Sequence, residues 1–271
     1  RSLKYFHETS YQFQHLFMDC NSIIYDAVHS IEQTDNFSRY EDEIISSLID
    51  KIKDYIYIIK PTDTVFIAFD GVAPLAKMEQ QRTRRHKTLF LSNLSFDEST
   101  PKKDKWNTSA ITPGTEFMEK LSKKINYEFT LKEKQLGVKK IIVSTSQEPG
   151  EGEHKLFDYL RKNDFKSDNI ALYGLDSDLI MLSIFHMNYC NNIYNFREAP
   201  EFIRNSLPVS VKSNDVNEPY FLDIEHLCKN ILAEMRCVDN DMYRVYDYVF
   251  LCFFLGNDFL NAYFENRLEN I

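Results

Sequence analysis

Seven carboxylates occupy positions in this chain where an acid follows an apolar run or lies among glycines. These acids are Asp19, Asp70, Glu151, Glu153, Asp176, Asp178 and Asp258. Hard divalent cations such as Mg²⁺ prefer oxygen ligands, and two ions about 3.5 to 4 Å apart need roughly this many carboxylates. The set therefore predicts a two-metal site of the kind that hydrolyses phosphodiesters.

Two of these acids form the pair Glu151 and Glu153, and two more form the pair Asp176 and Asp178. Residues two apart point to opposite faces of a strand and lie far apart around a helix, so regular structure would separate the members of each pair. We therefore expect both pairs in turns that lead into helices. The residues that give the backbone this freedom are Pro149, Gly150, Gly152 and Gly174.

Acidic spacing alone is not specific in a chain with 41 acids. The segment Asp239-Asn240-Asp241 has the same spacing but follows no apolar strand, and we interpret it as a solvated turn. Zinc and cysteine chemistry are disfavoured, because the five cysteines include no C-x-x-C pair and the seven histidines no H-x-x-x-H pair. His154, next to the acids, is interpreted as a hydrogen-bonding helix residue.

A basic cluster follows shortly after Asp70. On a helix, four of its polar residues occupy positions i, i+4, i+7 and i+8 and share one face, while Arg82 points elsewhere. The four are Lys77, Gln81, Arg84 and Arg85. Guanidinium groups bind terminal phosphates through paired hydrogen bonds, so this face is a candidate phosphate site. The alternative is a solvated helix surface.

The elements that would position these residues alternate between strand and helix. Expected strands cover residues 16–18, 65–69, 140–144 and 169–174, and expected helices cover residues 44–59, 114–134, 151–162, 221–236 and 243–255. Residues 92–107 and 200–219 are expected to be irregular. This order predicts an α/β fold with a mostly parallel central sheet flanked by helices, and functional groups at the carboxyl ends of its strands.

Length, composition and net charge limit the number of domains and the classes of protein to which this chain can belong. The 271 residues, 43% of them hydrophobic, are enough for one large α/β domain or two small ones. No signal peptide is evident at the N-terminus, and the longest apolar run, residues 249–255, is too short to span a bilayer. The net charge of −9 is unusual for a nucleic-acid enzyme, but the acids and bases are segregated along the chain, as a metal site beside a phosphate site requires.

With these residues assembled, the sequence resembles the Xrn family of 5'-to-3' exoribonucleases, within the PIN-like and flap-endonuclease-like 5' nucleases. The resemblance runs from about residue 16 to residue 260. It is carried by Phe17-Met18-Asp19-Cys20-Asn21-Ser22-Ile23 and by residues 69–74, 76–78, 80–85, 111–118, 149–155, 173–182 and 254–259.

The resemblance implies a PIN-like 5' nuclease domain in which all seven acids bind two Mg²⁺ ions, with Mn²⁺ as a substitute. Asp19, Asp70, Glu151 and Glu153 would lie nearer one ion, and Asp176, Asp178 and Asp258 nearer the other. It also implies a pocket for the 5'-monophosphate of single-stranded RNA, formed by Lys77, Gln81, Arg84 and Arg85, and the release of mononucleotides. The alternatives are a structure-specific DNA 5' nuclease and an inactive module that binds RNA.

The sequence departs from the family at three places. Tyr25 stands where the family usually has a histidine that stacks on a terminal base, and it either keeps this stacking or packs in the core. The segment before Leu16 is shorter than usual. The chain stops soon after Asp258, so we expect residues 1–271 to form a single nuclease domain without the family's second conserved region, which a partner protein could replace. The expected compartment is the cytoplasm, with the nucleus as the alternative.

Overall fold

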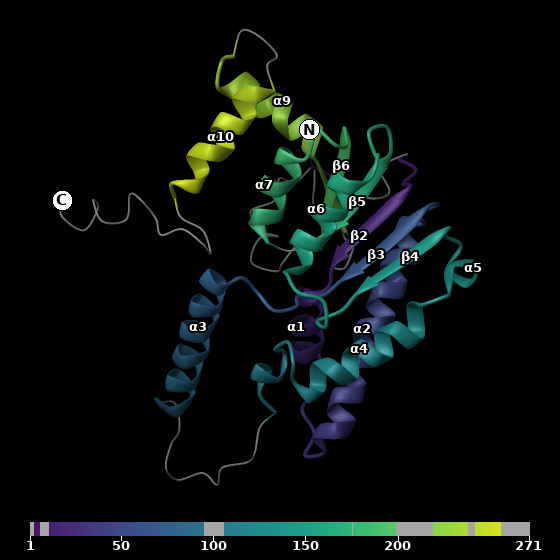
Figure 1. The fold of residues 1–271 in the computed structure, drawn as a ribbon, viewed down its shortest axis with the longest axis vertical. Helices are drawn as coiled ribbons and strands as arrows, with labels where there is room; N and C mark the ends of the chain where they lie inside the picture. The colour runs from purple at the N-terminus through teal and green to yellow at the C-terminus, as the bar shows by residue number, and fades with distance from the viewer. Residues whose placement is uncertain are drawn as a thin grey trace, which may run out of the picture.

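The structure, a computed structural model, describes residues 3–5, 11–94, 106–174, 176–198, 219–237 and 242–255. These residues form one seven-stranded sheet in the order β1-β7-β6-β5-β2-β3-β4 (Figure 1). The strands are β1 (Leu3–Tyr5), β2 (His15–Asp19), β3 (Thr64–Ala68), β4 (Lys140–Ser144), β5 (Asn169–Tyr173), β6 (Asn192–Arg197) and β7 (Tyr220–Asp223). The five strands from β6 to β4 run parallel, and β7 is antiparallel to both β6 and β1.

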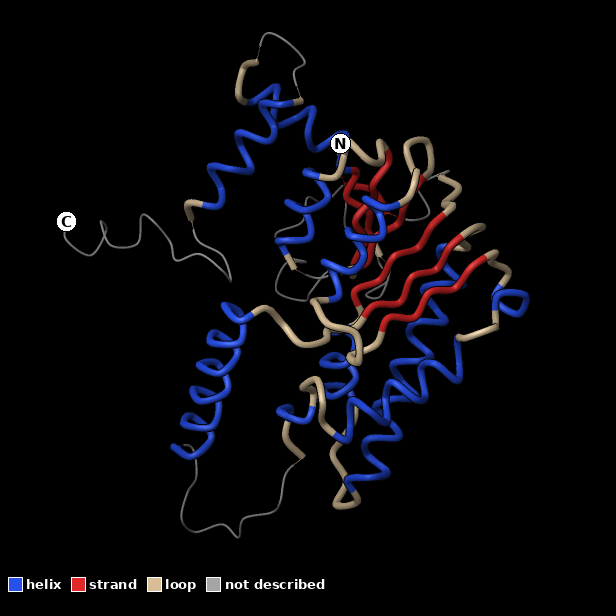
Figure 2. Tube along the Cα trace, in the orientation of Figure 1, coloured by secondary structure: helices blue, strands red, loops and turns tan. Residues whose placement is uncertain are grey.

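Helices lie on both faces of the sheet (Figure 2). The helices in the described part of the chain are α1 (Asn21–Ser30), α2 (Phe37–Ile59), α3 (Leu75–Leu94), the 3-10 helix η2 (Thr108–Ala110), α4 (Glu116–Phe129), α5 (Glu133–Leu136), α6 (Gly152–Lys162), α7 (Ser177–Phe185), α9 (Ile224–Glu234) and α10 (Tyr243–Phe253). None of them is long and apolar enough to cross a membrane. The predicted class, α/β with a mostly parallel sheet flanked by helices, is confirmed.

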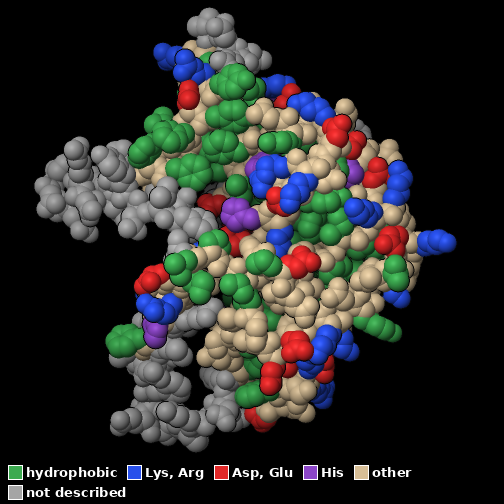
Figure 3. Space-filling model, in the orientation of Figure 1, with side chains coloured by type: hydrophobic (Ala, Val, Ile, Leu, Met, Phe, Trp, Pro, Cys, Tyr) green, Lys and Arg blue, Asp and Glu red, His purple; other side chains and the backbone are tan. Residues whose placement is uncertain are grey.

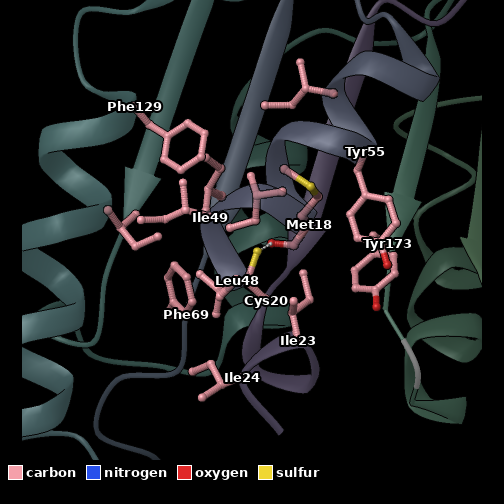
Figure 4. Close-up of a cluster of buried hydrophobic side chains, with 14 of the residues drawn as sticks. Met18, Cys20, Ile23, Ile24, Leu48, Ile49, Tyr55, Phe69, Phe129 and Tyr173 are labelled. Carbon is pink, nitrogen blue, oxygen red and sulfur yellow. Dashed lines mark hydrogen bonds between the residues drawn. The ribbon is translucent and has the colours of Figure 1, made fainter. Parts of the chain in front are cut away.

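The two cores follow from the alternation of side chains along buried strands. Leu16 and Met18 of β2 point into a core shared with α1, α2 and α4, whereas Phe17 points into a second core with α6, α7, α9 and α10. Figure 4 shows part of the first core, where Leu48 and Ile49 of α2 lie near Met18. Each fully buried side chain of this size contributes about 1.5 to 3 kcal/mol.

Several predicted elements are confirmed. The strands ending near Asp19 and Asp70, the strand over β4 and the strand over β5 are present with small shifts of their ends. The stripe of apolar residues predicted over residues 44–59 is the buried face of α2. This helix begins after Asn36, whose side chain accepts a hydrogen bond from the Arg39 backbone amide at 3.1 Å.

Three boundaries were predicted wrongly. The helix expected over residues 114–134 is two helices, α4 and α5, because Leu131 has a φ of 61° and cannot continue a right-handed helix. The helix expected from residue 221 starts at Ile224, since the preceding residues pair with β6 and β1 as strand β7. Residues 92–94, expected to be irregular, complete α3. Residues 95–105 and 199–218 lie outside the described part of the chain.

The strand order reverses direction between β2 and β5, in the middle of the sheet. From β2 the chain adds β3 and then β4 on one side, whereas β5 pairs with β2 on the other side and is followed by β6. Helix α1, which follows β2, packs in the first core, and α7, which follows β5, packs in the second. The chain therefore leaves adjacent parallel strands toward opposite faces, and in open α/β sheets this reversal opens a crevice at the carboxyl ends of the strands.

Candidate active site

The carboxyl ends of β2 and β3 bring together the first two predicted acids. Asp19 is the last residue of β2, and Asp70 follows β3 by two residues. Asn21 joins them: its Nδ2 donates to Asp70 Oδ2 at 2.5 Å, its Oδ1 accepts from the Asp70 backbone amide at 3.0 Å, and its own amide donates to Asp19 Oδ1 at 3.3 Å. One asparagine side chain thus sets the relative position of two carboxylates from different strands.

The start of α6 lies directly against this pair. The Gly152 amide donates to Asp70 Oδ1 at 2.7 Å, and a Cβ atom at Gly152 would lie 2.5 Å from Asp19 Oδ1. The loop before the helix is held by a hydrogen bond of 2.8 Å from the Gly71 amide to the Gly150 carbonyl. Position 152 therefore requires glycine, because any side chain there would displace Asp19.

Glu151 and Glu153 flank this glycine, and both are buried, with 3% and 8% of their surfaces exposed. Glu151 Oε1 lies 2.7 Å from the Lys77 ammonium, whereas its Oε2 accepts no hydrogen bond from any described residue. Nε2 of His154 lies 3.6 Å from Glu151 Oε2 and 3.9 Å from Glu153 Oε1. The ligand atoms of Glu151, Glu153 and His154 lie within 4.8 Å of one another and could hold a metal ion.

The third pair of acids comes from α7. Asp176 precedes the first residue of the helix, and Asp178 lies in its first turn. Their charges raise the pKa of Glu153, and Asp176 also raises the pKa of Asp19, so the acids of α7 lie within electrostatic range of those from β2 and α6. Both acid-x-acid pairs thus lie where a loop enters a helix, as predicted, with Glu151 and Asp176 at the two N-caps.

Burial and the charges of neighbouring acids raise the pKa values of three of these acids, Asp19, Asp70 and Glu153. Burial, followed by the charge of Asp70, raises the pKa of Asp19 well above its usual range. Burial also raises the pKa of Asp70, although the hydrogen bond from Gly152 opposes the shift. Burial and the neighbouring Glu151 raise the pKa of Glu153 to about 7. Divalent cations would relieve this repulsion, and the buried Glu151 oxygen would gain a partner, so the residues fit metal ions.

Helix α3 carries the predicted basic face. Lys77, 18% exposed, reaches back from its first turn to Glu151, while Arg82 pairs with Glu79 at 3.0 Å on the exposed side. The side chain of Gln81 is half-buried. Arg84 and Arg85 belong to the same helix, but the structure describes only their backbone. Lys77 is therefore the described residue that links the basic helix to the acids.

The remaining predicted residue with a described side chain is Tyr25, on α1. It is 41% exposed and lies one turn beyond Asn21, so it is not a core residue. Asp258 lies outside the described residues. So do Asp239 and Asp241, the acids with the same spacing that we interpret as part of a solvated turn. Figure 3 shows acidic side chains next to a histidine near the middle of one face, beside a broad hydrophobic area over α7 and α10.

Two residues that position the acids had no role in the sequence prediction. Asn21 joins Asp19 to Asp70. The Lys155 ammonium donates to the carbonyls of Phe69 at 2.8 Å and Thr145 at 2.9 Å, and thereby ties α6 to the segments that follow β3 and β4. The sequence signal for Asn21 was a side-chain amide two residues after an acid at the end of a strand. The signal for Lys155 was a lysine one helical turn after Glu151. Neither signal specifies a partner distant in sequence.

Comparison with known proteins gives consistent matches. Residues 2–198 match the family described as the XRN 5'-3' exonuclease N-terminus. The 5'-3' exoribonuclease 1 of Saccharomyces cerevisiae is 31% identical over 92% of this chain and 17% of its own length. The 5'-3' exoribonuclease 1 of Homo sapiens is 35% identical over 64% of this chain and 11% of its own length. The 5'-3' exoribonuclease 2 of Kluyveromyces lactis is 30% identical over 92% of this chain and 29% of its own length.

The chain thus spans less than a third of the length of each of these curated relatives. Among solved structures, the catalytic core of Rad2 in complex with DNA substrate matches 96% of this chain and 59% of its own chain, with 15% identity and a TM-score of 0.46. The fold assignment therefore rests on the strand order and the two helical layers themselves.

Proposed function

Because this chain belongs to the XRN 5'-3' exonuclease family, we propose that it hydrolyses single-stranded RNA stepwise from a 5'-monophosphate end. The observation that carries the proposal is the convergence of acids from β2, the segment after β3, α6 and α7, with Lys77 of the basic helix in contact with one of them. In this proposal the chain forms one nuclease domain that holds two divalent ions, Mg²⁺ or Mn²⁺.

Each group of acids has its own part in the proposed site. Asp19, Asp70, Glu151 and Glu153 would hold one ion, and Asp176, Asp178 and Asp258 would hold the other. When bound, the ions lower the pKa of the attacking water and stabilise negative charge on the scissile phosphate. Asn21 and Gly152 keep the carboxylates of Asp19 and Asp70 in place through the hydrogen bonds described above.

The basic face of α3 selects the end of the RNA. In this proposal Lys77, Gln81, Arg84 and Arg85 bind the terminal phosphate, and Tyr25 stacks on the terminal base. Water attacks the phosphorus that follows the first nucleotide, the bond from phosphorus to the 3' oxygen breaks, and the 3' oxygen takes up a proton. The products are a 5'-mononucleotide and an RNA with a new 5'-monophosphate, which is again a substrate.

The test compares four labelled substrates in Mg²⁺: single-stranded RNA with a 5'-monophosphate, the same RNA with a 5'-hydroxyl, and a DNA flap with each of these ends. We expect mononucleotides from the first RNA and much slower release from the second. Preferential cutting of the flap would identify a structure-specific DNA nuclease instead. No cleavage of any substrate, with RNA binding unchanged in Asp176→Ala, would identify an inactive binding module.

A further inference from the structure

His154 stands at the solvent side of two buried acids on the same helix. The imidazole is half-exposed, with 45% of its side chain accessible, whereas the side chains of Glu151 and Glu153 are 4% and 11% accessible. Its Nε2 lies 3.6 Å from Glu151 Oε2 and 3.9 Å from Glu153 Oε1. Both distances are longer than a hydrogen bond, so these contacts do not satisfy the two oxygens.

The same distances suit ligands of one cation. Metal–ligand bonds of about 2.1 Å place two ligand atoms of one cation at most about 4 Å apart. The distances from Nε2 to the two carboxylate oxygens, 3.6 and 3.9 Å, lie within this limit. All three residues come from α6 or its N-cap, so the backbone of one helix holds their spacing.

The second observation concerns Glu151 Oε2. The other oxygen of this carboxylate pairs with the Lys77 ammonium, but Oε2 is buried and accepts no hydrogen bond within the described part of the chain. A buried carboxylate oxygen without a partner is costly, because it has lost its water and gained nothing in exchange. His154 Nε2 lies 3.6 Å from this oxygen, and a cation between the two atoms would bind both.

We propose that His154 Nε2 is a metal ligand that completes, with Glu151 and Glu153, a mixed oxygen and nitrogen site for a divalent first-row transition ion such as Mn²⁺. Mg²⁺ prefers an all-oxygen shell and gains little from an imidazole, whereas transition ions bind imidazole well. His154 thus shifts the preference of one of the two proposed ions away from Mg²⁺. This inference rests on the proposed metal site but not on RNA as its substrate.

The decisive measurement is electron spin-echo envelope modulation of Mn²⁺ bound at one equivalent to the tag-free full chain. Wild-type protein should show modulation from a directly bound ¹⁴N, and protein labelled with ¹⁵N-histidine should show the ¹⁵N pattern instead. His154→Gln should lose the nitrogen signal and bind Mn²⁺ on the order of tenfold more weakly, with Mg²⁺ affinity nearly unchanged.

The matched control is His29→Gln, which removes another exposed histidine, one whose ring nitrogen contacts the Tyr25 carbonyl on α1 at 2.6 Å. It should keep both the nitrogen signal and the Mn²⁺ affinity. A wild-type spectrum without histidine nitrogen overturns the proposal, as does a nitrogen signal that survives in His154→Gln. A nitrogen signal in a protein that leaves RNA uncut would refute the proposed function and support this metal site. RNA cleavage by a protein without the nitrogen signal would support the proposed function and refute this metal site.

Discussion

The acid site and the basic helix of this protein are built in opposite ways. The described acids come from segments up to 159 residues apart, from Asp19 to Asp178. Asn21 and the Gly152 amide donate hydrogen bonds that fix Asp19 and Asp70. The basic residues come from a single helix, α3, which stands apart from the sheet (Figure 1). Lys77 is the described contact between the two regions.

The acid site and the basic helix are expected to serve different functions, namely metal binding and selection of the substrate end. Crowded, buried carboxylates oppose their own ionisation, so the acid site gains electrostatically from metal ions and has little freedom to move. The spacing of the basic residues, by contrast, is set by a single helix and does not depend on distant segments. We therefore expect substitutions in the acid site to change both turnover and stability, and substitutions on α3 to change the choice of substrate end.

The largest expected effect is at Asp19. Asp19→Asn keeps the shape and removes a buried charge, so turnover in Mg²⁺ should fall by about 10³-fold, the scale for losing a group that stabilises developing charge. Melting without metal should move to higher temperature, because burial and the charge of Asp70 penalise the Asp19 carboxyl group in the folded state but not in the unfolded chain. Asp50→Asn, on the exposed side of α2, is the control and should change neither quantity. Full activity in Asp19→Asn would remove it from the site.

The second effect is the response of stability to pH. The pKa of Glu153 is raised from 4.5 to about 7, so the folded protein binds more protons than the unfolded chain between these values. Its free energy of unfolding without metal should therefore fall by about 3 kcal/mol as pH rises from 4 to 8. Chemical denaturation at several pH values measures this, and Mg²⁺ should reduce the fall. A flat profile without metal would contradict the electrostatic description of the acid site.

The third effect concerns end selection by α3. Lys77→Ala should lower the ratio of kcat/KM for 5'-monophosphate RNA over 5'-hydroxyl RNA by about tenfold, the cost of one charge-assisted hydrogen bond. The ratio cancels any effect on Glu151 that both substrates share. Arg82→Ala, on the exposed side of α3, is the control and should leave the ratio intact. An equal loss on both RNAs would assign Lys77 to the acid site alone.

The smallest effect is expected at Tyr25. Tyr25→Leu removes the aromatic face but keeps an apolar side chain, so KM for RNA should rise about fivefold, the low end of the cost of one lost stacking contact. Tyr57→Leu, at a tyrosine of α2 that is 75% exposed, provides the comparison. If Tyr25→Leu instead lowers the melting temperature and leaves KM unchanged, the residue serves packing and not binding.

Prediction from the sequence succeeded where the signal was local. The buried stripe of α2 follows from a period of 3.6, and the strands that end near Asp19 and Asp70 follow from short continuous apolar runs. Both signals depend on neighbouring residues only. It failed at β7, where Phe221 and Leu222 pair with β6 and β1, because pairing with distant strands outweighed helical periodicity. It also missed the break at Leu131, which depends on one backbone dihedral angle.

By itself the sequence determined which acids follow strands, that the two acid-x-acid pairs lie at helix entries, and which residues share a face of α3. Only the tertiary structure decided that Asn21 joins Asp19 to Asp70, that Gly152 must lack a side chain, and that Lys77 pairs with Glu151. The reason is physical: secondary structure depends on residues a few positions apart, whereas the shared edge of a parallel sheet depends on the order in which distant strands pair.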